Sequence, residues 1–345
     1  MAKKKDTTNA AEQAQLAPSK EVKRIAVFTS GGDAPGMNAA IRAVVRTASF
    51  HDLHVFGIYR GYQGMIEGDI KRLEKRDVGN IIHRGGTILK TARSMDFMTK
   101  EGREHAYETL LAHDIDACVA IGGNGTFTGA SVFSKEYDIP MIGIPGTIDN
   151  DLYGTDLTIG YDTAVNTAVD AVDRIRDTAD SHNRLFFVEV MGRNAGFIAL
   201  STAIGSGAGS VLIPETDTNL TDLVDRLRKS AKRKKLFSLV IVAEGNKNGN
   251  ASTIAEKVKA QLKDSFDIKV TIIGHLQRGG SPSSTDRVLA SRLGYAAVEG
   301  LLKGQSNVMT GLHNNEIAYI PFDDAIKKSK AVQEDLVRMA EILAI

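Results

Sequence analysis

Short apolar runs with the character of β-strands alternate with amphipathic helical patterns along almost the whole chain. This alternation is typical of parallel sheets that carry helices on both faces. Eight such runs are more than one ordinary sheet comfortably holds. We therefore predict an α/β protein of two doubly wound lobes, with the active site in the cleft between them. The predicted strands are residues 24–29, 55–59, 117–121, 141–144, 185–190, 211–213, 239–243 and 270–273. The predicted helices are residues 37–48, 161–175, 220–232, 253–262 and 287–302.

Composition limits the classes of function. The 345-residue chain carries 43 basic and 42 acidic residues, so its net charge of +1 gives no reason to expect nucleic-acid or membrane binding. The single cysteine, Cys118, excludes a disulfide within the chain and lies in an apolar run, so we expect a buried thiol. Residues 1–20 are polar and lack the apolar centre of a secretory signal. We predict that they form a disordered tail and that the protein is cytoplasmic.

Two carboxylates follow one of the predicted strands. The strand over residues 141–144 stops at Pro145, and Asp149 and Asp151 come shortly after it. In open α/β sheets ligands bind beyond the carboxyl ends of the strands, so both acids are candidates for chemistry. The alternative is an aspartate-rich turn that caps the next helix.

Two glycine-rich segments, residues 29–38 and 121–126, each follow a predicted strand. Glycines let backbone N–H groups approach a phosphate closely, and a helix N-terminus adds a favourable field. Met37 and Asn38 occupy the places of the Lys and Ser or Thr of a P-loop, so the first segment is not a Walker motif. Its glycine spacing does not fit a dinucleotide fold either, which excludes an NAD-dependent dehydrogenase. Each loop alone is weak evidence, but the pair favours a nucleotide or another multiply phosphorylated ligand.

Three basic groups stand beside predicted strands. They are Arg184, Arg193 and the segment with His275 and Arg278. Placed at the carboxyl ends of strands, these cations would form a cradle for a sugar phosphate. The alternative for each is a surface arginine or a hydrogen-bonded histidine.

Together these segments resemble the bacterial-type ATP-dependent 6-phosphofructokinases (the phosphofructokinase A family). The similarity runs from about Arg24 to the end of the chain, and the block PGTIDND with the downstream VEVMGR is highly specific for that family. The resemblance implies a phosphofructokinase-like fold, with ATP as co-substrate and Mg²⁺ as metal. It implies transfer of the γ-phosphoryl group to the 1-hydroxyl of fructose 6-phosphate by an allosteric, homotetrameric enzyme of glycolysis. The implied lobes are a nucleotide-binding lobe, residues 21–159 with 277–326, and a sugar-phosphate-binding lobe, residues 160–276 with 327–345.

The resemblance also implies roles for single residues. Asp149 is the implied general base, Thr147 and Arg193 complete the catalytic set, and Asn124 and Asp151 are the implied Mg²⁺ ligands. The implied ATP-binding residues are Gly32, Arg93, Ser94, Gly123, Asn124, Gly125 and Thr126. The implied sugar-phosphate residues are Thr147, Ile148, Asp149, Arg184, Met191, Gly192, Arg193, Glu244, Lys269, His275, Leu276, Gln277 and Arg278. The implied effector residues are Arg42, Arg46, Arg176, Gly207, Gly209, Arg233 and Lys235. Family members place the Arg184 and Lys269 positions across a subunit interface, so the active site is expected to be complete only in an oligomer.

Two glycines favour ATP over pyrophosphate as the phosphoryl donor. Pyrophosphate-using relatives carry an Asp at the position of Gly125, where it would crowd and repel the α-phosphate. They carry a Lys at the position of Gly146, which suits the smaller anion. Glycine at both positions leaves room for the nucleotide.

Three positions depart from the family pattern. Asn124 replaces an Asp that helps to hold magnesium, so we expect weaker metal binding and slower turnover. Lys269 replaces an Arg that binds the 6-phosphate, and the two-pronged geometry is lost. Gly209 replaces a Glu that takes part in discriminating ADP from phosphoenolpyruvate. The alternative function is therefore a catalytically weakened relative that binds sugar phosphate or nucleotide as a regulatory subunit.

Overall fold

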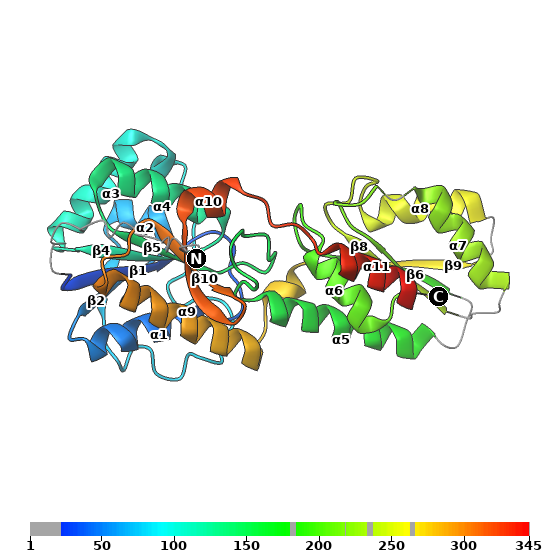
Figure 1. Ribbon diagram of the computed structural model, residues 1–345, viewed down its shortest axis with the longest axis horizontal. Helices are drawn as coiled ribbons and strands as arrows, with labels where there is room; N and C mark the ends of the chain where they lie inside the picture. The colour runs from blue at the N-terminus through cyan, green and yellow to red at the C-terminus, as the bar shows by residue number, and fades with distance from the viewer. Residues whose placement is uncertain (1–21, 180–183, 218, 233–236, 263–265, 345) are drawn as a thin grey trace, which may run out of the picture.

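The computed structural model describes residues 22–179, 184–217, 219–232, 237–262 and 266–344. The strands in these residues form two separate sheets, and each sheet lies in its own lobe along the long axis of the molecule (Figure 1). The predicted two-lobed α/β architecture is confirmed. The predicted tail, residues 1–20, lies outside the described residues.

The larger sheet has seven strands in the order β11-β10-β5-β4-β1-β2-β3. Its central strands pair in parallel, whereas the edge strands β3 and β11 are antiparallel to their neighbours. The parallel strands are buried on both faces, which explains their nearly continuous apolar sequences. The strands are β1 (Arg24–Thr29), β2 (His54–Ile58), β3 (Ile70–Leu73), β4 (Ala117–Gly122), β5 (Met141–Pro145), β10 (Val308–His313) and β11 (Glu316–Pro321).

Helices cover both faces of the larger sheet (Figure 1). One face carries α1 (Met37–Phe50) and α9 (Ser284–Leu302). The other face carries α2 (Gly61–Glu67), α3 (Lys100–Ala112), α4 (Asn124–Tyr137) and α10 (Phe322–Lys327). Successive residues of a strand point to opposite faces, so Val27 packs in the first core and Phe28 in the second. Cys118 is buried in the second core as predicted, and burial raises the pKa of its thiol to about 12.

The smaller sheet has four parallel strands in the order β7-β8-β6-β9. They are β6 (Arg184–Val190), β7 (Ser210–Leu212), β8 (Phe237–Ala243) and β9 (Asp267–Ile272). One face packs against α5 (Tyr161–Ala179) and α6 (Phe197–Ser206), and the other against α7 (Leu220–Lys232) and α8 (Ala251–Leu262). The final helix, α11 (Glu334–Leu343), lies beside α6 (Figure 1).

Each of the predicted strands is present, with ends that shift by at most three residues. Three further strands, β3, β10 and β11, are not among the predicted ones, and they form the antiparallel pairs β2–β3 and β10–β11 at the two edges of the larger sheet. The larger sheet draws on residues 21–159 and 277–326 and the smaller on 160–276, but the residue-level lobe boundaries stay a prediction. Among the helices described, none combines the length and apolar character needed to cross a membrane.

A buried carboxylate fixes the point where the chain enters the smaller lobe. Asp286, in the first turn of α9, accepts hydrogen bonds from the backbone N–H groups of Gly160 and Thr163, both at 2.8 Å, and from the Thr163 hydroxyl at 2.5 Å. Ser283 caps α9 and donates to Asp162 at 2.5 Å. The N-termini of α5 and α9 are thereby tied to each other.

Candidate active site

The turn that follows β5 is shaped by residues other than its two aspartates. Asn150 has a left-handed backbone conformation, with φ of 54°. Its side chain accepts a hydrogen bond from the Thr158 N–H at 3.1 Å and donates to the Asp156 carbonyl at 3.3 Å. Asn150 therefore closes the turn, and the carboxylates of Asp149 and Asp151 are not needed to hold it.

The alternative that Asp149 and Asp151 cap the next helix is wrong. The N–H groups of Gly160 and Thr163, at the start of α5, already donate to Asp286. A cap from a distant part of the chain thus replaces the local one that the sequence suggested as an alternative.

Asp149 is a buried carboxylate with an unpartnered oxygen. The residue is 6% exposed, and within the described part of the chain its Oδ1 has no hydrogen-bond partner. Burial, and then the charge of Asp151, raise the pKa of Asp149, while the charges of Arg278 and Arg193 lower it. Its backbone N–H donates to the hydroxyl of Thr147 at 3.3 Å. A carboxylate of this kind is a stronger base than an exposed aspartate and is suited to accept a proton from a bound hydroxyl.

Asn124 and Asp151, the two predicted metal ligands, face each other. The Asn124 amide nitrogen donates to Asp151 Oδ2 at 3.3 Å, and a half-turn of the amide would present its oxygen instead. Burial raises the pKa of Asp151. Mg²⁺ is usually bound by one or two carboxylates together with waters and substrate phosphates, so this pair of oxygen donors fits it. The described residues hold no cluster of three or more acidic, His or Cys side chains that would form a metal site on its own.

The two predicted glycine-rich loops meet beyond β1 and β4. A Cβ atom at Gly122 would lie 2.5 Å from the Ser30 carbonyl oxygen, so only glycine fits there. The Thr126 hydroxyl donates to the same carbonyl at 3.2 Å. The N-terminus of α4, at Asn124, has no side-chain cap in the described structure, which leaves its N–H groups available to an anion. A Cβ at Gly125 would meet nothing within 4 Å, so there is open space beside it.

Arg278 reaches from the end of η2 (Gly274–Arg278) to the first glycine-rich loop. Its Nη1 donates to the Asp33 carbonyl at 3.1 Å. The same nitrogen lies 2.7 Å from the place where a Cβ of Gly32 would be. Glycine at position 32 therefore admits the guanidinium, which brings a cation next to the predicted phosphate loop.

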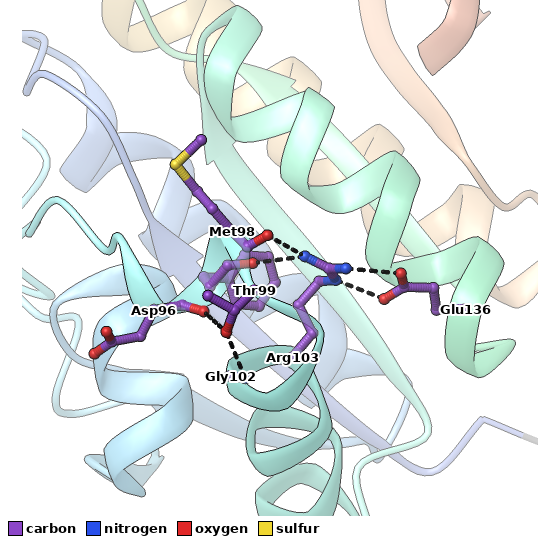
Figure 2. Close-up of polar contacts among 7 residues, drawn as sticks. Asp96, Met98, Thr99, Gly102, Arg103 and Glu136 are labelled. Carbon is purple, nitrogen blue, oxygen red and sulfur yellow. Dashed lines mark hydrogen bonds and ion pairs between the residues drawn. The ribbon is translucent and has the colours of Figure 1, made fainter.

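The segment that carries the predicted ATP residues Arg93 and Ser94 is fastened to α4 by Arg103. This side chain, 13% exposed, forms a two-pronged ion pair with Glu136 of α4 at 2.5 and 2.8 Å. It also donates to the Phe97 carbonyl at 3.0 Å. Figure 2 shows its further bond to the Met98 carbonyl, at 2.9 Å, beside the pair with Glu136. One guanidinium therefore joins the short helix η1 (Asp96–Met98) to the helix that begins at Asn124.

Local capping fixes the same segment from within. The Ser94 hydroxyl accepts a hydrogen bond from the Phe97 N–H at 3.2 Å. The Thr99 hydroxyl accepts from the Gly102 N–H at 3.0 Å and so caps α3 (Figure 2). Arg93 itself is exposed at the rim of this segment.

Replacing Arg103 with Met should destabilise the protein by about 2 kcal/mol, because Glu136 loses its charged partner and two carbonyls lose a donor. The pKa of Glu136 is lowered, chiefly by its hydrogen bond to Arg103. The stability that the Arg103–Glu136 ion pair adds is fully present above the ordinary pKa of glutamate, and it is lost as the pH falls through the lowered pKa of Glu136. Chemical unfolding at neutral and at acid pH measures it, and the difference from wild type should shrink in acid. Arg174→Met, which removes an exposed ion pair with Asp170, is the control; a deficit that does not change with pH would contradict the assignment.

The loops that follow β6 and β8 lock together. Gly192 has φ of 142°, and a Cβ there would lie 2.5 Å from the Ala195 carbonyl oxygen. Arg193 has a left-handed φ of 56°, and its N–H donates to Glu244 Oε1 at 2.7 Å. This hydrogen bond holds the loop after β6, which begins at Met191, against the loop after β8.

Gln277, in η2, links the end of β6 to helix α5. Its side chain is buried, its Oε1 accepts from the Met191 N–H at 2.8 Å, and its Nε2 donates to the Ala164 carbonyl at 3.3 Å. The amide that the resemblance assigned to sugar phosphate is therefore occupied by contacts within the chain. His275 and Leu276, on the same helical turn, are exposed.

Charged residues of both lobes act on Asp149. Its electrostatic neighbours are Asp151 and Arg278, together with Glu244 and Arg193 of the smaller lobe. The fold therefore brings the predicted base, one predicted metal ligand and two predicted cations to one place.

Arg184 and Lys269 lie elsewhere, and the expectation that Arg184 stands at the carboxyl end of a strand is wrong. Arg184 is the first residue of β6 and already pairs with Phe237 of β8, so it stands at the amino end of the strand. At about 3.3 Å per residue, it lies roughly 20 Å from the far end of that strand. Asp267 pairs with both cations, at 3.4 Å to Arg184 and 3.0 Å to Lys269.

The predicted effector residues fall into separate groups. Arg42 and Arg46 lie on α1 of the larger lobe, whereas Arg176 is in the last turn of α5 (Figure 1). Arg176, Gly207 and Gly209 line a cavity of ≈ 620 Å³ that residues of α11 also line. Arg233 and Lys235 lie outside the described residues.

Lys330 is a neighbour of the site that sequence reasoning missed. Its ammonium group donates to the Asp156 carbonyl at 2.8 Å, across 174 residues of sequence. Burial lowers the pKa of Lys330 to about 8, while the charges of Asp156 and Asp151 act in the opposite direction. No local motif marks this lysine, and only the return of the C-terminal segment to the turn reveals it.

Comparison with known proteins gives consistent matches. The family model described as phosphofructokinase matches residues 24–301. The chain is 56% identical to ATP-dependent 6-phosphofructokinase 2 of Bacteroides thetaiotaomicron, over 94% of this chain and 99% of that protein. It is 53% identical to ATP-dependent 6-phosphofructokinase 1 of Thermus thermophilus, over 94% of this chain and 100% of that protein. The solved structure of phosphofructokinase from Saccharomyces cerevisiae matches with a TM-score of 0.85 and 36% identity over 94% of this chain; the match spans 48% of the yeast chain.

Proposed function

The chain belongs to the phosphofructokinase family, and we propose that it transfers the γ-phosphoryl group of ATP to the 1-hydroxyl of fructose 6-phosphate. The observation that carries the proposal is the buried Oδ1 of Asp149, which has no partner among the described residues. The turn that carries it contacts the second glycine-rich loop, where Asn124 donates to Asp151, and its carboxylate lies within the field of Arg193 and Arg278. The products are fructose 1,6-bisphosphate and ADP.

Asp149 acts as the general base. Its carboxylate takes the proton of the sugar 1-hydroxyl as that oxygen bonds to the γ-phosphorus, and the bond to the bridging oxygen of ADP breaks. Arg193 and Arg278 offset the charge on the phosphoryl oxygens, which is the electrostatic work that this chemistry mainly requires. The glycine-rich loops and the uncapped N-terminus of α4 hold the nucleotide phosphates.

Asp151 and Asn124 would hold Mg²⁺ at this site. The ion, when bound, supplies positive charge to the phosphates and helps to orient them. Because one of the two donors is an uncharged amide, the protein contributes a single negative charge from this pair. The metal is therefore expected to bind less tightly than in a site with two carboxylates.

Replacing Asn124 with Asp should lower the Mg²⁺ concentration for half-maximal activity by about tenfold, because a second carboxylate joins the ligand set. Activity titrated against free Mg²⁺ at constant magnesium–ATP measures the change. In EDTA the new carboxylate faces Asp151 without a cation, so the thermal midpoint should fall. Asn124→Ala is the matched control and should show neither the tighter metal response nor the loss in EDTA. An unchanged Mg²⁺ response in the Asp variant would contradict this view of the site.

We infer that the working enzyme is an oligomer, and a homotetramer is the expected form. Arg184 lies roughly 20 Å from the end of β6 that approaches Asp149, and Lys269, which pairs with Phe186, lies roughly 13 Å from that end. A neighbouring subunit that presents these cations to the sugar phosphate would complete the pocket. The predicted cytoplasmic location remains part of the same proposal.

A coupled assay for fructose 1,6-bisphosphate tests the proposed function. It is run on the full chain with ATP and then with pyrophosphate as donor, over a series of Mg²⁺ concentrations. Turnover with ATP alone supports the kinase. Binding of fructose 6-phosphate or ATP without any turnover would favour the regulatory-subunit alternative, and turnover with pyrophosphate alone would overturn the choice of donor.

A further inference from the structure

The loop that carries Asp149 and Asp151 leaves the larger sheet after β5 and is closed at its base. It starts at Gly146 and returns at Ile159, where the two residues form a parallel bridge and the Ile159 N–H donates to the Pro145 carbonyl at 2.9 Å. Hydrogen bonds from Asn150 hold it across the middle. The position of the carboxylates therefore depends on the contacts of this loop.

The C-terminal segment supplies contacts from outside the loop. Ser329 forms an antiparallel bridge with Leu152, directly after Asp151. The Lys330 ammonium donates to the Asp156 carbonyl at 2.8 Å, and the Asn150 side chain donates to the same oxygen at 3.3 Å. Lys330 and the residue between the two aspartates thus share one acceptor.

The same segment connects the lobes. Residues 328–333 lead from α10, on the larger sheet, to α11, beside α6 in the smaller lobe (Figure 1). The Lys330 ammonium lies 5.2 Å from the centroid of the Phe197 ring, the first residue of α6. The half-buried ammonium of Lys330 therefore contacts both the loop of residues 146–159, which carries Asp149, and the smaller lobe, which carries Arg193.

We propose that Lys330 is a positioning residue that holds the Asp149–Asp151 turn in register with the smaller lobe. The inference rests on the proposed kinase function and extends it to a residue with no part in binding or proton transfer. Its ammonium donates to the Asp156 carbonyl and lies over the Phe197 ring, and its positive charge acts on Asp151. Loss of this cation should misplace the base relative to Arg193 more than it weakens substrate binding.

The test compares Lys330→Met, which keeps the apolar stem, with Lys330→Arg, which keeps the charge. Lys328→Met is a matched control, because Lys328 is on the same segment, lies 5.2 Å from the Tyr153 ring and pairs with Asp324 at 3.1 Å. We expect Lys330→Met to lower kcat about 10- to 100-fold, with both KM values within about threefold of wild type and an unchanged thermal midpoint. Lys330→Arg should recover most of the loss, and Lys328→Met should match wild type.

A kcat of Lys330→Met within about twofold of wild type would overturn the proposal, as would equal losses in the two Met variants. A loss that only follows a lower thermal midpoint would also overturn it. If Lys330→Met does not fold, Lys330→Gln takes its place, and equal kcat in the Gln and Arg variants rejects the role. Failure of the kinase proposal is distinguishable, since the wild type itself would then be inactive with ATP and fructose 6-phosphate.

Discussion

Replacing Asp149 with Asn should lower the turnover number by about 10²–10⁴-fold, the usual range for loss of a general base. The amide has nearly the same shape, but it cannot take the proton of the sugar hydroxyl. Asp149 Oδ1 has no partner within the described residues, and burial raises the pKa of this carboxyl. The substitution therefore removes a charge that is costly to bury, and the folded protein should be at least as stable as wild type. Steady-state kinetics and thermal unfolding measure the two effects.

The control is the same chemical change on the surface. Asp170→Asn alters an exposed carboxylate of α5 that pairs with its neighbour Arg174, and it should leave turnover unchanged. If Asp149→Asn kept more than about a tenth of wild-type turnover, another group would have to accept the proton. A large loss of stability in Asp149→Asn would point instead to a structural role for the carboxylate.

The parallel core was predictable because its strands are buried on both faces. Runs such as the one that became β4 are apolar at each position, and glycine or proline marks their ends. The strands β3 and β11 lack this signal, since they lie at the sheet edges and mix charged or polar residues with apolar ones. Of the three strands that were not predicted, β10 alone is largely buried. It lies between β5 and β11, and its pairing with β5 joins residues far apart in sequence.

The site was predictable where its residues form local motifs. The turn with Asp149 and the glycines near Asn124 each follow a strand directly, so sequence and fold point to the same edge of the sheet. Gln277 and Lys330 show the limit of such reasoning. The bonding of Gln277 to the Met191 N–H and the approach of Lys330 to Asp156 depend on tertiary contacts across 86 and 174 residues. Spacing along the chain carries no signal for either contact.

Asp286 shows the same limit for helix caps. Its carboxylate serves the N-terminus of α5 from another helix, 126 positions after Gly160 in the sequence. Sequence rules for caps consider only residues close to the helix start in the chain, so they cannot find Asp286. Because the distant cap satisfies the α5 donors, the nearer carboxylates are left available for chemistry.

Replacing Gly125 with Asp should lower kcat/KM for ATP by at least about 10²-fold, because two unit charges about 4 Å apart repel by about 4 kcal/mol at an effective dielectric constant near 20. A Cβ at this position meets nothing within 4 Å, so the new side chain occupies open space. It also lies in the first turn of α4, where a negative charge suits the helix dipole. The loss should therefore appear in nucleotide use and not in the thermal midpoint.

Two neighbouring variants separate size from charge at Gly125. Gly125→Ala adds only the Cβ and should remain close to wild type, whereas Gly125→Asn matches the volume of aspartate without its charge. If repulsion of the nucleotide phosphates dominates, the Asn variant should keep most of the kcat/KM that the Asp variant loses, and higher ionic strength should narrow the gap between them. Equal losses in both would show that crowding alone excludes the nucleotide. Wild-type ATP kinetics in the Asp variant would mean that the phosphates do not pass the N-terminus of α4, and the assignment of that loop to ATP would have to be abandoned.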